Sequence, residues 1–284
     1  MDSITLFVNA VCQKKSTIQG PWLHLVIVYD GTEALFIVRW KERVLPMQSH
    51  EHSIFPPAAT ADEHGLVAIT PVLNTEMLLD AYRHGIFPWS EGPVCWFSPD
   101  PRAVFLREFI KIPKNIGKIT RKAEFRITVD EAFGAVIRKC ADAHRAEGEW
   151  ITPGFIASYT ELHNMGHAHS VEVWQGDNLV GGLYGVQLRG LFAGESMFHT
   201  VSNASKVAFA ALIYWLDHVG NLVLDAQVLN DHTESLGAVA IPRTEYLTML
   251  KYAQRLRVRY EGEKWVTPPD DKLTRLLTHP PEKS

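Results

Sequence analysis

The residues best suited to chemistry lie in the apolar segment 222–228, which is interrupted by one acid and one amide. Alternation along a β-strand would place Asp225 and Gln227 on one face and their apolar neighbours on the other. A carboxylate beside a carboxamide can accept a proton or orient a nucleophile while the amide fixes a carbonyl group. A charged pair at a strand end or sheet edge would give the same pattern, so the strand alone leaves both interpretations open.

A second acid, Glu195, interrupts the apolar segment 191–198. An acid among large apolar residues indicates a buried, functional position, although a solvent-facing glutamate is the alternative. Strict alternation would place Phe192 on the opposite face from Glu195 and Met197. A β-bulge near Gly194 would bring all three to one site.

Three histidines, His163, His167 and His169, partly match the spacing of a helical zinc site. We expect Gly166 to end the helix before His167, and no glutamate follows His163, so we predict that no metal ion is bound. The three cysteines of the chain are widely spaced, without a Cys-x-x-Cys pair, which argues against a disulfide framework and a cysteine zinc site.

The composition is that of a globular protein: of 284 residues, 46% are hydrophobic and 21% are charged. The longest apolar segments fall short of the about 20 residues that cross a bilayer, and the N-terminus lacks the form of a signal peptide. We expect a cytoplasmic protein without membrane contact.

One basic segment stands out against the formal net charge of -4. Between Arg107 and Arg126 there are seven basic residues and two acidic ones, which gives this segment a charge of +5. A solvated loop could have this composition. The alternative is a strip that binds the phosphates of a nucleic acid, because phosphate contact requires positive charge and no particular sequence.

Capping residues and periodicity predict the elements that position these groups. Expected helices begin at Asn74 or Thr75, near Asp130, after Thr152 with Pro153 as the first helical residue, and near Ala204, and the last of these ends at Gly220. The prolines between Ile86 and Arg102 predict an ordered loop. We expect strands at 23–29 and 34–40, joined by Asp30-Gly31, an antiparallel meander at 170–174, 179–186 and 191–198, and a further strand at 222–228. This order of elements predicts an α+β fold.

Several motifs together resemble the bacterial leucyl/phenylalanyl-tRNA–protein transferase family. They occur in the order of the family from about His52 to Leu250, and their combined specificity far exceeds that of any single motif. The motifs are Leu79–Trp89, Trp96–Arg102, Trp150–Thr152, Gly166–Trp174, Leu179–Val186, Gly194–Phe198, Gln227–His232 and Ser235–Gly237.

The resemblance implies a C-terminal domain with an acetyltransferase-like (GNAT-like) fold, expected at 102–260, and a small α/β N-terminal domain, expected at 51–101. Residues 1–50 lie outside the match and form an extension of unknown role, whose own pattern predicts a β-hairpin, and 261–284 are expected to form a loosely held tail. We expect a monomer, because no heptad pattern or unexplained apolar stripe requires a partner.

The resemblance also implies the reaction and its residues. The family transfers Leu or Phe, and less readily Met, from an aminoacyl-tRNA to proteins that begin with Arg or Lys, marking them for degradation. No metal or coenzyme takes part. The implied catalytic pair is Asp225 and Gln227. The implied substrate-binding residues are Trp89, Trp150, Leu183, Phe192, Met197, Leu212 and Leu224; chemical reasoning adds Glu195, for the acceptor's positive charge. The implied tRNA-binding residues are Lys114, Lys118, Arg121 and Lys122.

Two other functions remain open. An acetyl-CoA-dependent N-acetyltransferase would share the fold, yet the segment 200–205 before the expected central helix lacks the glycines of a pyrophosphate-binding loop. A non-catalytic adapter that binds basic N-termini through Glu195 is the other alternative, and binding of such peptides without turnover would support it.

Overall fold

The computed structural model describes residues 53–90, 93–144, 151–221 and 223–256 and, of the rest, only the strands at 14–19, 23–29, 34–40, 260–261 and 264–265. Trp150 and nearly all of the expected tail at 261–284 lie outside the described residues. The chain separates into two compact units, Met1–Leu45 and Pro46–Ser284. The expected domain boundary at residue 101 stays a prediction.

The first unit is a three-stranded antiparallel sheet in the order β1-β2-β3. Two of its strands are the β-branched, apolar segments predicted from the sequence, and Tyr29 pairs with Ala34 across the expected turn, which itself lies outside the described residues. The prediction of a hairpin is confirmed, and β1 adds a third strand to it. The strands are β1 (Lys14–Gln19), β2 (Leu23–Tyr29) and β3 (Ala34–Trp40).

The second unit begins with a small antiparallel sheet in the order β4-β6-β5 and one helix. Asn74 caps this helix, since its side chain accepts the backbone N–H of Met77, and Gly85 takes a φ of +78° just after it. The prediction of a loop over 86–102 is wrong, because two strands lie there. Pro88 is tolerated because it belongs to an edge strand. The elements are η1 (Ala58–Thr60), β4 (Leu66–Thr70), α1 (Thr75–Arg83), β5 (Phe87–Ser90) and β6 (Val94–Phe97).

A seven-stranded sheet in the order β13-β7-β12-β11-β10-β9-β8 forms the centre of this unit. The predicted meander is confirmed as β9-β10-β11, and β12 joins it parallel to β11 after a helical crossover. The strands are β7 (Arg102–Phe105), β8 (Phe125–Val129), β9 (Ala168–Gln175), β10 (Asn178–Leu188), β11 (Leu191–His199), β12 (Val223–Gln227) and β13 (Val239–Ile241).

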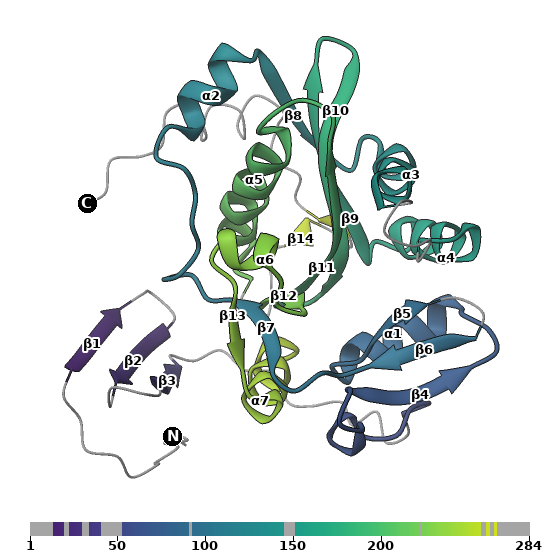
Figure 1. Cartoon of the computed structure of the whole chain (residues 1–284), viewed down its shortest axis with the longest axis vertical. Helices are drawn as coiled ribbons and strands as arrows, with labels where there is room; N and C mark the ends of the chain where they lie inside the picture. The colour runs from purple at the N-terminus through teal and green to yellow at the C-terminus, as the bar shows by residue number, and fades with distance from the viewer. Residues whose placement is uncertain are drawn as a thin grey trace. The chain divides into compact units, whose positions relative to one another are not determined.

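Helices cover both faces of the large sheet (Figure 1). The long α5 packs on one face, and α3 and α4 pack on the other. The helices are α2 (Ile116–Lys122), α3 (Phe133–His144), α4 (Pro153–Asn164), α5 (Ala204–Val219), α6 (Asp231–Ser235) and α7 (Arg243–Ala253); a short pair, β14 (Tyr260–Glu261) and β15 (Lys264–Trp265), follows. The predicted α+β class is confirmed.

The expected helix ends agree with the structure. The Thr152 side chain accepts the Phe155 N–H, with Pro153 in the first turn of α4, and Gly220 ends α5 with a φ of +83°. No helix within the described residues is long and apolar enough to span a membrane.

Candidate active site

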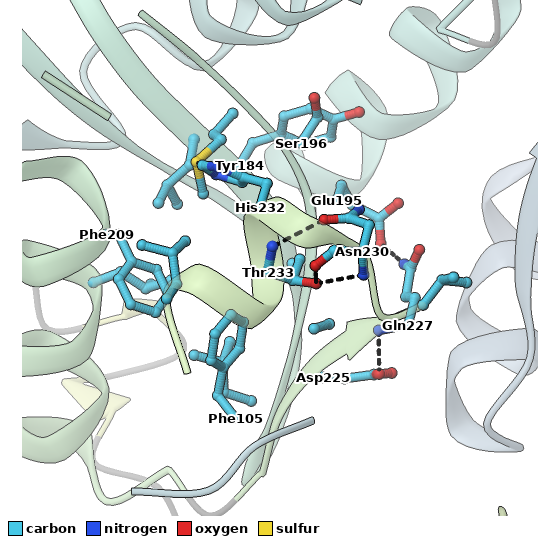
Figure 2. A pocket seen from close by; sticks show the side chains of 18 of the residues that line it. Phe105, Tyr184, Glu195, Ser196, Phe209, Asp225, Gln227, Asn230, His232 and Thr233 are labelled. Carbon is cyan, nitrogen blue, oxygen red and sulfur yellow. Dashed lines mark hydrogen bonds between the residues drawn. The ribbon is translucent and has the colours of Figure 1, made fainter. Parts of the chain in front are cut away.

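A pocket of about 490 Å³ opens beside the middle of β11 and the C-terminal end of β12. Figure 2 shows its two parts, an apolar side next to Phe105 and Phe209 and a polar side next to Glu195 and Gln227. The residues predicted from the sequence that line this pocket are Trp89, Leu183, Glu195, Met197, Leu212, Leu224, Asp225 and Gln227.

The strand that carries the acid and the amide is irregular. Asp225 pairs with Val104 of β7 and Gln227 with Ala103, so the register shifts between them, and Gln227 takes a φ of +63°. Simple alternation therefore does not describe this segment. The link between the two residues is the backbone N–H of Gln227, which donates to Asp225 Oδ1 at 2.8 Å, as in an Asx-turn.

Asp225 is fully buried in an ion pair with Arg102 of β7. The guanidinium donates from Nε to Oδ1 at 2.9 Å and from Nη2 to Oδ2 at 2.6 Å. The Tyr246 hydroxyl donates to Oδ2 at 2.8 Å. All the bonds of this carboxylate thus come from groups that hold it in place, and its charge is neutralised within the protein.

Arg102 is held as firmly as its partner. Its guanidinium carbon lies 4.7 Å from the ring centroid of Phe87 and 4.4 Å from that of Tyr246, and Nη1 donates to the Gly85 carbonyl at 3.1 Å. Burial, the largest single cause, acts to lower the pKa of Arg102, but Asp225, together with Tyr246 and Tyr82, raises that pKa above its ordinary value. Sequence reasoning missed this residue, whose only signal was its place in the motif Trp96–Arg102.

Glu195 lies at the meeting point of three hydrogen-bond donors. Tyr82 of α1 donates to Oε1 at 2.6 Å, Tyr159 of α4 donates to Oε2 at 3.0 Å, and Gln227 Nε2 donates to Oε1 at 2.8 Å. Burial raises the pKa of Glu195 to about 7, although both tyrosine hydroxyls act to lower it. The two tyrosines were also missed. The only signal for Tyr82 was its place in the motif Leu79–Trp89, and nothing in the local sequence of Tyr159 distinguishes it from a core tyrosine.

The expected β-bulge in β11 is present. Tyr184 of β10 pairs with Ser196 and Gly185 with Gly194, so Glu195 is the extra residue. Phe192 belongs to the same core cluster as the apolar pocket residues and is fully buried, but it is not among the residues that line the pocket. The apolar lining includes Phe105, Leu183, Met197, Phe209, Leu212, Leu224 and Leu236.

The lining of the pocket also includes an exposed aromatic residue and a histidine. Trp89 remains 45% exposed while lining the pocket, and its ring centroid lies 5.9 Å from that of Phe97. His232, in the first turn of α6, has Nε2 3.1 Å from the sulfur of Met197. Asn230 fixes the start of this helix through a capping box with Thr233, which Figure 2 shows beside the polar side.

The four predicted tRNA-binding residues lie away from the pocket lining. All four are exposed, and they belong to α2 or to the turn before it. The pocket and this basic strip, Lys114, Lys118, Arg121 and Lys122, are separate features of the same unit.

Two of the three histidines, His163 and His169, lie beside the same carboxylate, Asp130. His163 Nδ1 lies 2.8 Å from the Ala168 carbonyl, and His169 Nδ1 lies 2.7 Å from Asp130 Oδ2. In the part of the chain that the structure describes, no group of three or more His, Cys, Asp or Glu residues is placed to hold a metal ion.

The apolar and polar sides of the pocket determine which groups a bound molecule can present to the site. The apolar side can enclose a side chain of leucine or phenylalanine size. The polar side presents the Gln227 carboxamide and the Glu195 carboxyl group beside this apolar part.

Comparison with known proteins gives concordant matches. A family model described as leucyl/phenylalanyl-tRNA protein transferase matches residues 104–251, and one described as its N-terminal domain matches residues 72–100. The leucyl/phenylalanyl-tRNA–protein transferase of Edwardsiella ictaluri is 50% identical over 209 residues, which cover 72% of this chain and 86% of the relative. The transferase of Shewanella baltica (strain OS155) is 48% identical over 211 residues, covering 72% and 89%, and that of Shigella dysenteriae is 46% identical over 227 residues, covering 78% and 95%.

Proposed function

Because this chain belongs to the leucyl/phenylalanyl-tRNA–protein transferase family and is thus an aminoacyltransferase, we propose that it acts on proteins that begin with Arg or Lys. It transfers leucine or phenylalanine, and less readily methionine, from tRNA to their α-amine, which marks them for degradation in the cytoplasm. The observation that carries the proposal is the pocket, whose apolar side adjoins Glu195 and Gln227.

The apolar side receives the side chain of the transferred amino acid. Leu183, Leu212 and Leu224 enclose it, and Met197 adds a flexible thioether that adapts to either a branched or an aromatic occupant. The terminal adenosine of the tRNA, or the acceptor peptide, stacks on the exposed part of Trp89.

Gln227 and Asp225 position the reacting groups. The Gln227 amide nitrogen donates to Glu195, so its carbonyl oxygen is left to accept an N–H of the incoming amine. Asp225, itself held by Arg102, fixes the backbone of Gln227. The amino acid arrives as an activated ester and the α-amine has a pKa of about 8, so positioning dominates and no metal or coenzyme is required.

We expect a negative charge of the protein to attract the acceptor and positive charges to attract the tRNA. Glu195 supplies the negative charge for the basic first residue of the acceptor. The exposed strip Lys114, Lys118, Arg121 and Lys122 neutralises tRNA phosphates. The sheet with α5 on one face and α3 and α4 on the other supports a GNAT-like fold, and we expect a monomer.

The test is transfer of labelled leucine or phenylalanine from charged tRNA to short peptides. We expect transfer to a peptide that begins with Arg and none to a matched peptide that begins with Ala. Asp225→Asn should reduce transfer at least about tenfold, because the neutral amide no longer balances Arg102 and the Gln227 backbone loses its fixed acceptor. Folded wild-type protein that transfers neither amino acid would contradict the proposal.

A further inference from the structure

Glu195, Tyr82 and Tyr159 form a closed ring of three short contacts. The two tyrosine hydroxyls lie 2.6 Å apart, Tyr82 lies 2.6 Å from Glu195 Oε1, and Tyr159 lies 3.0 Å from Oε2. Each contact requires one hydrogen, and the two phenols supply two. Ionised Glu195 therefore leaves one contact without a hydrogen, whereas protonated Glu195 supplies the third. The ring is complete when Glu195 holds a proton.

This count identifies where a proton can be stored beside the reacting groups. Resting on the transfer reaction proposed above, we infer that the Glu195 carboxylate accepts the proton that the acceptor's α-ammonium must lose, and is thus a catalytic residue. Gln227 Nε2, 2.8 Å from Oε1, places its amide between this carboxylate and the amine.

Asp225 is a poorer candidate for this step. It is fully buried, and its oxygens already accept from Arg102, Tyr246 and the Gln227 backbone. Glu195 retains some exposed surface and lines the pocket. Of its two oxygens, Oε2 has one donor among the described residues, so it keeps accepting capacity for an incoming ammonium hydrogen.

The step balances without any further reactant. The carboxylate takes one proton from the ammonium, and the nitrogen lone pair forms the C–N bond with the ester carbonyl carbon. The C–O bond to the tRNA ribose then breaks, and the departing oxygen takes the second proton from nitrogen. One proton remains on Glu195 and completes the ring with Tyr82 and Tyr159, from which it returns to solvent.

The groups that face Glu195 set the pH at which it can act. Burial, aided by the Asp225 charge, raises the pKa of Glu195 to about 7, while Tyr82, Tyr159 and the Arg102 charge act to lower it. Burial raises the pKa of Tyr184 of β10, and the nearby Glu195 charge raises it further, while His232 lines the same pocket from α6. The accepting form of Glu195 therefore increases as the pH rises through about 7.

The test measures single-turnover transfer from Leu-tRNA to a saturating Arg-start peptide by full-length protein, over the pH range in which Glu195 and an α-amine of pKa about 8 titrate. The wild-type rate should rise through about pH 7. Glu195→Gln should be at least about tenfold slower at neutral pH, and its deficit should shrink once the amine is already neutral.

Tyr159→Phe is the second variant, since it removes one donor to the carboxylate with little change of volume. It should shift the rising limb of the pH profile to higher pH, because the ionised carboxylate loses a hydrogen bond that stabilises it. Tyr214→Phe on α5 makes the same chemical change outside the ring and should leave the limb in place.

Three outcomes would overturn the inference. A Glu195→Gln deficit that is constant with pH would indicate a role in binding or positioning alone, and a wild-type profile in either Glu195→Gln or Tyr159→Phe would remove Glu195 from the proton step. Wild-type protein without transfer at any pH would overturn the proposed function and this inference with it. If the wild-type protein transfers the amino acid but a variant keeps the wild-type pH profile, only the inference is overturned and the proposed function stands.

Discussion

At the scale of single residues, the site depends on a charge pair that is shielded from water. Arg102 and Asp225 neutralise each other, and the Arg102 guanidinium lies against the rings of Phe87 and Tyr246. The backbone N–H of Gln227 donates to the same Asp225 carboxylate. A buried pair of this kind contributes little net stability when intact, but removing one partner leaves an uncompensated charge. Its value to the protein is therefore the fixed position of Gln227.

Arg102→Met tests this account of the pair. Loss of the guanidinium leaves Asp225 charged and buried, and should lower the free energy of unfolding by about 3 to 5 kcal/mol. Arg107→Met is the matched control, since Arg107 pairs with Asp217 but its side chain is 71% exposed, so that change should cost about 1 kcal/mol or less. Chemical denaturation of both variants gives the two values. Equal losses would show that burial of the Arg102 pair has no special effect.

The same residues show what one sequence can and cannot reveal. Asp225, Gln227 and Glu195 were detectable because a polar residue in an apolar strand is unusual. Their partners were not, because Arg102 lies 123 residues before Asp225 and Tyr82 lies 113 residues before Glu195. Contacts over such separations depend on the topology of the whole sheet, which local patterns do not encode.

At the scale of elements, one bulge and one crowded glycine shape the pocket. Glu195 is the extra residue of the bulge in β11, opposite the step from Tyr184 to Gly185 in β10. A Cβ on Gly185 would collide with the Ala193 carbonyl and the Phe192 ring. Gly185 therefore permits the close approach of the two strands beside Phe192.

Gly185→Ala and Gly194→Ala compare two glycines that face each other across this pair of strands. The first should cost about 1 to 3 kcal/mol or more, because the added methyl group overpacks the core. The second should stay within about 1 kcal/mol of wild type, since its Cβ would have its nearest neighbour at 3.6 Å. Thermal unfolding of both proteins provides the comparison. A Gly185→Ala protein as stable as Gly194→Ala would contradict the role of the close approach.

Elements were predicted best where a cap or a strict alternation marked them. Asn74, Thr152 and Gly220 occupy the expected capping positions, and the meander β9-β10-β11 follows the expected turns. The segment 86–102 was mistaken for a loop because its prolines excluded a helix and masked two short strands. Edge strands tolerate proline, and a local pattern does not tell which strands lie at an edge.

At the scale of the whole molecule, the negative net charge and the basic strip have different consequences. The formal net charge of -4 repels a polyanion at long range, whereas Lys114, Lys118, Arg121 and Lys122 present an exposed local patch of the opposite sign. We expect binding of tRNA to depend on this patch and to weaken steeply with added salt.

The double variant Lys118→Gln, Arg121→Gln measures that dependence. If each side chain meets one phosphate, the slope of log affinity for tRNA against log salt concentration should become shallower by about two. Arg138→Gln with Lys251→Gln removes the same charge from exposed positions on α3 and α7 and should leave the slope unchanged. Equal slopes in the two double variants would contradict binding through the strip.

The central claim is that the apolar side of the pocket receives the side chain of the transferred amino acid. Leu212→Trp tests it most directly, because the larger ring would occupy the pocket from α5 while the basic strip stays intact. We predict a folded protein that binds charged tRNA with wild-type affinity and loses transfer of both leucine and phenylalanine to an Arg-start peptide. Transfer of either amino acid at the wild-type rate by this variant would contradict the account.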